Sequence, residues 1–329
     1  MLGPQGFIDL HTHGIGSYDT RTKKPEDILN MARLHAKAGT SAILLTIYSG
    51  TIQKMRMNIE AVRKAIKSQK SEVRSQKSNP PLPPFDKGGM GGIFNSSRIT
   101  HHASRILGVH LEGPFLNPIK CGALDKDSFI KPTISNLKKL IEGYEDIIKI
   151  ITIAPELPGA LNVIEKCVSM GIKVNMGHSD ATYKKALDGK KAGATGISHL
   201  FNAMRPFHHR EPGLAGLGLL DEDLYAEVIA DGIHIDPVTL RLIFKIKRHD
   251  RIILISDSIK AIKSKGGAVY PFRKQGRGFL SNGVYTDSGV LAGSAITMAD
   301  ALRYVKKLGI PEKVARKAAI ENPTRYLTS

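Results

Sequence analysis

The sequence predicts an α/β protein whose fold is a (β/α)8 barrel. Eight short apolar segments alternate with segments of helical periodicity, and histidines or carboxylates stand at the ends of five of those apolar segments. Parallel strands joined by helices close into such a barrel, which carries its reactive groups at the C-terminal ends of the strands. A doubly wound open sheet is the alternative. It is disfavoured because no glycine-rich phosphate-binding motif follows the first strand.

The eight apolar segments are the predicted barrel strands. They are short and bounded by glycine, proline or polar residues, as buried parallel strands are. In chain order they are residues 6–14, 41–47, 105–113, 148–154, 173–177, 196–200, 225–230 and 251–255.

Helices are predicted between most of these strands and after the last one. In residues 25–39, for example, Ile28, Leu29, Met31, Ala32 and Leu34 form an apolar face, and Gly39 ends the segment. The predicted helices are residues 25–39, 52–67, 134–144, 160–170, 183–192, 237–247, 295–308 and 311–320.

Residues 68–100 interrupt the alternation of strands and helices. Four prolines and four glycines stand there among Ser, Gln and Lys. Such a composition buries too little apolar surface to order a chain. We therefore expect residues 1–329 to form one barrel domain, with residues 68–100 as a low-complexity, disordered surface insertion.

The composition argues against several classes of partner and location. The net charge is +18, but its cations are spread along predicted helix faces without a dense block interleaved with aromatic residues, so we do not expect nucleic acid as a partner. No apolar run reaches the ~18 residues of a membrane span, and no signal peptide is recognisable. Cys121 and Cys167 make no disulfide framework. We expect a cytoplasmic protein without a membrane partner.

Six side chains at the ends of predicted strands are candidates for a metal site. His11 and His13 belong to the first strand and lie two residues apart, so both can point to the same face. A single histidine at a strand end is more often structural, but four histidines with two carboxylates favour zinc or iron. The six are His11, His13, Glu112, His178, His199 and Asp257.

Several further stretches resemble the N-acetylglucosamine-6-phosphate deacetylases, a family within the amidohydrolase superfamily of metal-dependent hydrolases. The resemblance extends from Gly6 to about Arg325 and skips the insertion. It is carried by the segments GFIDLHTHG (6–14), HLEGPF (110–115), GHSDA (177–181), SHLFNAM (198–204), REPG (210–213), DGIH (231–234) and LAGS (291–294).

The resemblance implies roles for the matching residues. Glu112, His178 and His199 would hold the main divalent metal ion, and His11 with His13 would hold a second ion. Asp257 would be the catalytic carboxylate. The substrate, a sugar phosphate, would contact Ala123, Asn202, Ala203, Arg210, His234 and Leu291. The family also implies a homodimer, in which a neighbouring subunit can complete the phosphate site.

The chain departs from the family pattern in two places. Leu124 stands where the family usually has a histidine that contacts the substrate and polarises its carbonyl group. The family's small β-sandwich domain, built from both chain ends, is expected to be missing. Two other functions stay open: a related amidohydrolase that acts on another N-acyl or cyclic amide, and a non-catalytic barrel that keeps the ligands.

Overall fold

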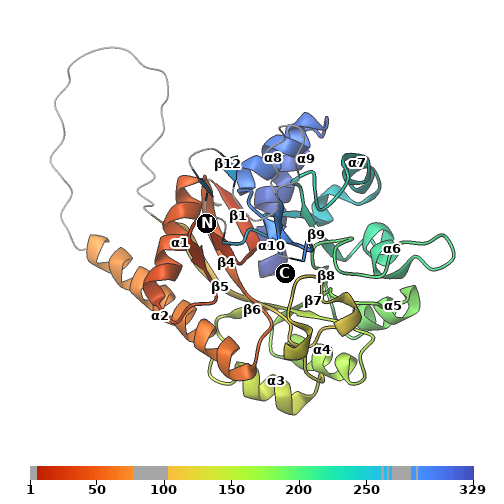
Figure 1. Ribbon diagram of the computed structural model, residues 1–329, viewed down its shortest axis with the longest axis horizontal. Helices are drawn as coiled ribbons and strands as arrows, with labels where there is room; N and C mark the ends of the chain where they lie inside the picture. The colour runs from red at the N-terminus through yellow and green to blue at the C-terminus, as the bar shows by residue number, and fades with distance from the viewer. Residues whose placement is uncertain (1–5, 78–102, 261–262, 265–266, 269–282, 287) are drawn as a thin grey trace.

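The computed structural model describes residues 6–77, 103–260, 263–264, 267–268, 283–286 and 288–329. Eight parallel strands form one sheet at the centre of the molecule, and helices surround it (Figure 1). The strands are β1 (Phe7–Thr12), β4 (Thr40–Ile47), β5 (Arg105–Glu112), β6 (Ile148–Ile153), β7 (Lys173–Met176), β8 (Gly196–Ile197), β9 (Tyr225–Ile229) and β10 (Ile252–Ile255). The predicted barrel is confirmed.

The barrel closes between its first and last strands at the C-terminal end. There the Asp257 amide donates to the His11 carbonyl oxygen over 2.9 Å, and the His13 amide donates to the Ser258 carbonyl oxygen over 2.8 Å. The other seven strand pairs form parallel ladders in chain order. Closure therefore occurs through the segments that carry three of the six candidate ligands.

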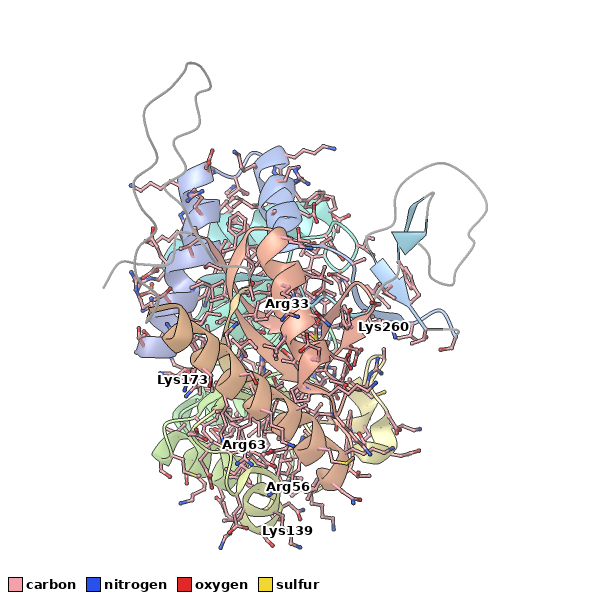
Figure 2. All side chains as sticks on the ribbon, turned by 90° about the vertical axis from the view of Figure 1, so that its left-hand side faces the viewer. Arg33, Arg56, Arg63, Lys139, Lys173 and Lys260 are labelled. Carbon is pink, nitrogen blue, oxygen red and sulfur yellow. The ribbon has the colours of Figure 1, made fainter. Side chains whose placement is uncertain are left out.

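The helices lie outside this barrel, apart from the last. They are α1 (Pro25–Lys37), α2 (Ile52–Lys77), α3 (Ile134–Ile141), α4 (Ala160–Ser169), α5 (Tyr183–Lys191), α6 (Gly213–Leu220), α7 (Pro237–Ile246), α8 (Met298–Lys307), α9 (Glu312–Arg316) and α10 (Asn322–Thr328). Figure 2 shows basic side chains on these outer helices, including Arg33, Arg56, Arg63 and Lys139. Among the described helices, none combines the length and apolarity needed to cross a bilayer.

Short elements connect the larger ones. Single turns lie at Pro118–Lys120, Lys126–Ser128 and His249–Arg251, and a π-helical turn, Lys317–Glu321, joins α9 to α10. Two-stranded ribbons are formed by β2 (Gly14–Ile15) with β3 (Tyr18–Asp19), by β11 (Lys263–Ser264) with β12 (Gly267–Ala268), and by β13 (Gly283–Tyr285) with β14 (Leu291–Ser294).

Apolar side chains fill the barrel interior below the strand ends. Tyr225 and Ile229 belong to this interior cluster, whereas the alternate residues Ala226 and Val228 pack outward under the helices, as the pleat of a strand requires. Tyr326 of α10 completes the interior cluster, and Asn322 bonds the carbonyl oxygen of Ile252, the first residue of β10. Helix α10 thus closes the N-terminal end of the barrel, and the polar groups lie at the opposite end.

The predicted end of the second helix is wrong. Helix α2 continues to Lys77, so residues 68–77 are helical and not part of a disordered insertion. Lys, Gln, Glu and Arg favour helices, and the Gln69 side chain bonds the Ser104 carbonyl oxygen and the Ile106 amide. Residues 78–100 of the predicted insertion lie outside the described residues.

The sequence analysis also missed α6, because three of its eight residues are glycine, which weakens a helix. Close packing explains why two of these glycines, Gly216 and Gly218, carry no side chain. A Cβ atom on Gly216 would lie 2.3 Å from Pro212, and one on Gly218 would lie 2.6 Å from Ile197. Tertiary packing has overridden the local helix preference.

Candidate metal centre and substrate pocket

The ends of five strands bring the six candidate ligands together around Glu112. His11 lies within β1 and His13 just beyond it, and Glu112 is the last residue of β5. His178, His199 and Asp257 are each the second residue after their strand, namely β7, β8 and β10. All six residues are buried. Parallel strands end at the same rim, which is why side chains far apart in the sequence meet here.

Three of these residues have left-handed backbone conformations. The φ angles are +46° for His178, +30° for His199 and +46° for Asp257. Residues other than glycine seldom adopt this region, and such strain persists where the surrounding structure holds it, often at functional sites. The turn at each strand end directs the side chain back toward the barrel axis.

The Glu112 carboxylate is the centre of the cluster. Its Oε1 atom lies 3.1 Å from Nε2 of His178, 3.1 Å from Nε2 of His199 and 3.5 Å from Nε2 of His11. Its Oε2 atom lies 3.2 Å from Nε2 of His13. Asp257 approaches from the other side, with Oδ1 3.7 Å from Nε2 of His11 and 3.6 Å from Nε2 of His13.

The other ring nitrogens fix how these imidazoles face the centre. Nδ1 of His178 lies 2.8 Å from the Lys120 carbonyl oxygen, and Nδ1 of His199 lies 3.2 Å from the Asn202 carbonyl oxygen. A carbonyl oxygen only accepts, so each Nδ1 carries hydrogen and donates. A neutral ring then presents the Nε2 lone pair to Glu112, which is the orientation of a metal-binding histidine.

Glu227 holds His11 in the same way, and sequence analysis did not identify it. Its Oε2 atom lies 2.9 Å from Nδ1 of His11, and its Oε1 atom accepts from the Asn175 amide over 2.9 Å. A signal was present, because Glu227 is the one charged residue within the apolar segment Tyr225–Ile229. A buried carboxylate behind a histidine is the usual second partner of a metal ligand.

The buried carboxylates of the cluster are stabilised by positive charge. Burial by itself would raise the pKa of the Glu112 carboxyl, but His13, His11 and His178 hold that pKa well below its ordinary value. Burial by itself would lower the pKa of His11, but the adjacent carboxylates of Glu112 and Glu227 outweigh it and hold the pKa well above its ordinary value. Positive charge on a proton or a divalent ion therefore stabilises these buried carboxylates.

The donor set fits a divalent metal ion. Imidazole nitrogens and carboxylate oxygens are the ligands that zinc and iron take in proteins. Nε2 of His11 is buried without a hydrogen-bond partner, as a coordinating nitrogen would be in the absence of its ion. Two sets of ligand atoms lie within 4.8 Å of one another and face the centre, namely His11 with Glu112 and His199, and His11 with His13 and Asp257.

The cluster forms the floor of a cavity of about 1120 Å³. Five of the six residues expected to bind substrate line this cavity, namely Ala123, Asn202, Ala203, His234 and Leu291. Leu124 and Tyr48 line it as well, together with Glu112 and Asp257. The volume suits a small ligand such as a sugar phosphate.

His234 is fixed by a carboxylate that sequence analysis did not single out. Asp231 accepts from Nδ1 of His234 over 2.6 Å and from the amides of Ile233 and His234. Burial would raise the pKa of Asp231, but the bond from His234 keeps it below its ordinary value. The carboxylate fixes the orientation of the imidazole, whose Nε2 atom is left to bond a group in the cavity.

Arg210 does not join the other predicted binding residues. It is exposed, its guanidinium lies 2.9 Å from Nε2 of His209, and it does not belong to the cavity lining. Within the described chain, therefore, Arg210 and His234 do not face one ligand.

Comparison with known proteins agrees with this arrangement. The model of the amidohydrolase family matches residues 5–327. The chain belongs to the amidohydrolase family. It is 34% identical over 304 residues to the N-acetylglucosamine-6-phosphate deacetylase of Bacillus subtilis, covering 92% of this chain and 69% of that protein. It is 30% identical over 322 residues to the N-acetylgalactosamine-6-phosphate deacetylase of Escherichia coli, covering 98% of this chain and 77% of that one.

A solved structure gives the same result for the fold of this amidohydrolase. It is an aspartate-to-alanine mutant of the N-acetylglucosamine-6-phosphate deacetylase from Mycobacterium smegmatis, in complex with N-acetylglucosamine 6-phosphate. The TM-score is 0.77 at 26% identity, and the match covers 99% of this chain and 77% of that one. The chain is thus shorter than the relatives it matches.

Proposed function

We propose that the protein hydrolyses the acetamide of N-acetylglucosamine 6-phosphate to glucosamine 6-phosphate and acetate. The observation that carries the proposal is the convergence of His11, His13, His178, His199 and Asp257 on the Glu112 carboxylate. Hydrolysis of an unactivated amide needs an activated water and a proton donor for the leaving amine, and this cluster offers both. The identity of the relatives supports the sugar phosphate as substrate.

The cluster would hold one or two divalent ions, either zinc or iron. Glu112, His178 and His199 would bind the main ion, and His11 with His13 would bind the second. A bound ion of this kind supplies Lewis acidity, which brings the pKa of water toward ~7. The proposal agrees with the Nε2 lone pairs of His178 and His199, which both face Oε1 of Glu112.

Asp257 would act as the general base and then as the general acid. Its carboxylate lies at the edge of the cluster and also lines the cavity, so it can reach both a water at the floor and a substrate above it. As the water oxygen attacks the acetyl carbon, Asp257 would take the proton from that water. It would then give the proton to the amine nitrogen as the C–N bond breaks.

The rest of the cavity would hold the sugar phosphate. His234, backed by the ionised Asp231, suits the phosphate, and the turn that contains Asn202 and Ala203 lies beside His199. Ala123 and Leu291 would pack against the sugar. Arg210 would complete the phosphate site of a neighbouring subunit, since it lies outside its own cavity, and we therefore propose a homodimer.

Acetate release tests the proposal. Purified protein supplied with zinc or iron should release acetate from N-acetylglucosamine 6-phosphate, and Asp257→Asn should abolish this release. An exposed carboxylate variant, Glu165→Gln on α4, serves as the matched control and should retain full activity. A folded, metal-loaded protein that releases no acetate would contradict the proposal and favour another N-acyl or cyclic amide substrate, or a non-catalytic barrel.

A second sugar phosphate merits the same assay. The relative from Escherichia coli is named an N-acetylgalactosamine-6-phosphate deacetylase and is 30% identical. The two sugars differ only in the configuration at C4, which lies away from the acetamide. Comparing kcat/KM for both would assign the sugar without affecting the proposed chemistry.

A further inference from the structure

Tyr48 lies beside the candidate metal centre and has no part in the proposed function described above. It directly follows β4, the strand between β1 and β5, and so lies between the strands that carry His13 and Glu112. Its ring stacks on the imidazole of His13, with 3.8 Å between ring centroids and 20° between ring planes. It lines the cavity together with Glu112, Asp257 and Leu124.

The ring of Tyr48 is held from both sides. The guanidinium carbon of Arg21 lies 4.3 Å from the ring centroid. His13 already occupies one face, and two groups this close to one centroid cannot share a face, so Arg21 covers the other. Asp19 fixes Arg21 in turn with two bonds, of 2.9 Å from Nε and 2.8 Å from Nη2. The aromatic ring is thus positioned before any ligand binds.

The phenol oxygen of Tyr48 is free to bond a ligand. Among the described residues it makes no hydrogen bond, and Tyr48 lines the cavity. The hydroxyl of the buried Tyr326, in contrast, donates a hydrogen bond to Oδ1 of Asn175. A hydroxyl that is held in position and has no partner within the protein can bond a ligand.

The proposed reaction lacks one donor that Tyr48 can supply. Negative charge develops on the acetyl oxygen as water attacks, and a donor placed there lowers the barrier. Leu124, which lines the same cavity, cannot donate a hydrogen bond. A phenol hydroxyl is protonated at neutral pH and can donate a hydrogen bond.

We propose that Tyr48 donates a hydrogen bond to the acyl oxygen of the substrate, a role that Leu124 cannot fill. Tyr48 keeps its proton throughout, so it adds no step to the proton transfers assigned to Asp257. Arg21 covers the ring face opposite His13, so the ring keeps its position when the ligand binds. The proposal rests on the proposed amide hydrolysis.

Removal of the hydroxyl alone is the direct test. Tyr48→Phe keeps the ring between His13 and Arg21, so melting temperature and metal content should not change. The kcat for acetate release should fall about 100-fold, with KM little affected, as expected of a donor that acts in the transition state. Tyr18→Phe, a half-buried tyrosine on β3 outside the cavity lining, is the matched control. Unchanged kcat in Tyr48→Phe would overturn the proposal.

A double variant separates the proposed role from a general effect on the site. Leu124→His should restore most of the activity lost in Tyr48→Phe, and it should raise the activity of the unmodified chain much less. Such coupling is expected when two groups serve one acceptor. Equal fold-changes from Leu124→His in both backgrounds would mean that the two side chains act on different atoms.

Acetohydroxamic acid provides a readout that does not depend on turnover. This acetyl analogue should bind the zinc-loaded protein about 3- to 10-fold more weakly in Tyr48→Phe than in Tyr18→Phe, the scale of one lost hydrogen bond, as measured by calorimetry. If the unmodified protein deacetylates neither sugar phosphate but this difference is seen, the proposed function fails and the role of Tyr48 stands. Equal affinities would overturn the role of Tyr48 whether or not the protein is active.

Discussion

At the scale of single residues, the centre depends on which atom of each imidazole faces Glu112. His178 and His199 donate from Nδ1 to backbone carbonyl oxygens, and His11 pairs its Nδ1 with Glu227. These partners leave three Nε2 atoms facing Oε1 of Glu112. The orientation of these candidate metal ligands therefore depends on the groups that bond their Nδ1 atoms.

Replacing a ligand should empty the main metal site. We expect His178→Ala to lower the metal content of the purified protein severely, because one of its three proposed ligands is lost. Elemental analysis measures this directly, with His209→Ala as control, since His209 is exposed and outside the cavity lining. Equal metal content in both variants would exclude His178 as a ligand.

Replacing the partner of a ligand should have a smaller effect. Glu227→Gln removes the charge behind His11 while nearly preserving volume, so we expect metal affinity to fall about 10- to 100-fold with the fold retained. Competition with a chelator measures that affinity, and the exposed Glu165→Gln is again the control. An unchanged affinity would show that Glu227 supports only the interior of the barrel.

At the scale of elements, the site depends on how β1 contacts its neighbours. Helix α1 contributes His35, which is buried and whose Nε2 lies 3.2 Å from Oγ1 of Thr12, between His11 and His13 in the chain. Thr12 in turn bonds the hydroxyl of Ser258, just beyond Asp257. The positions of these ligand-bearing segments are thus linked to the packing of α1.

The burial of His35 predicts how the stability of the folded protein changes with pH. Burial lowers the pKa of His35 from 6.5 to about 4, so between these values the unfolded chain binds a proton that the folded chain does not. The contribution of neutral His35 to the stability of the folded protein is therefore fully present above about pH 6.5 and is lost as the pH falls toward 4. The stability difference between the unmodified protein and His35→Leu should therefore shrink by roughly 2–3 kcal/mol from pH 7.5 to 4.5.

Chemical denaturation of both proteins at the two pH values measures this difference. His35→Leu carries no titratable group, so the protonation of other residues contributes equally to both proteins and cancels. A stability difference that does not change with pH would mean that His35 remains protonatable in the folded protein.

At the scale of the whole molecule, the position of Arg210 determines how it could contribute to the proposed phosphate site. Arg210 is exposed and outside the cavity lining that contains His234. Arg210→Ala should weaken binding of the phosphorylated sugar by about 1.5–3 kcal/mol, the range for a charge-assisted hydrogen bond, and should barely change binding of the unphosphorylated sugar. Equal losses would mean that Arg210 supports the fold.

A mixing experiment tests whether that contact crosses between subunits. Alone, Asp257→Asn should be inactive and Arg210→Ala should be weakly active. In a hybrid dimer, one site would combine an intact Asp257 with an intact Arg210 from the partner subunit, so we expect activity to rise when the two variants are unfolded and refolded together. No gain from a hybrid that has been shown to form would place Arg210 in its own subunit's function.

The sequence by itself determined the barrel, the order of its strands and the six candidate ligands that the structure brings together. Apolar periodicity and polar strand ends are local features, and parallel strands place their ends at one rim whatever their spacing in the chain. The family resemblance added the residues that line the cavity. The sequence also contained signals that were missed, such as Glu227 within an apolar strand.

Only the tertiary structure decided which groups face one another. His11 and Glu227 lie 216 positions apart, and their contact depends on barrel closure and strand register, which no local pattern contains. The left-handed turns at His178, His199 and Asp257, the stacking of Tyr48 on His13 and the exclusion of Arg210 from the cavity have the same origin. Local preferences gave way there to packing, as they also did in the glycine-rich helix α6.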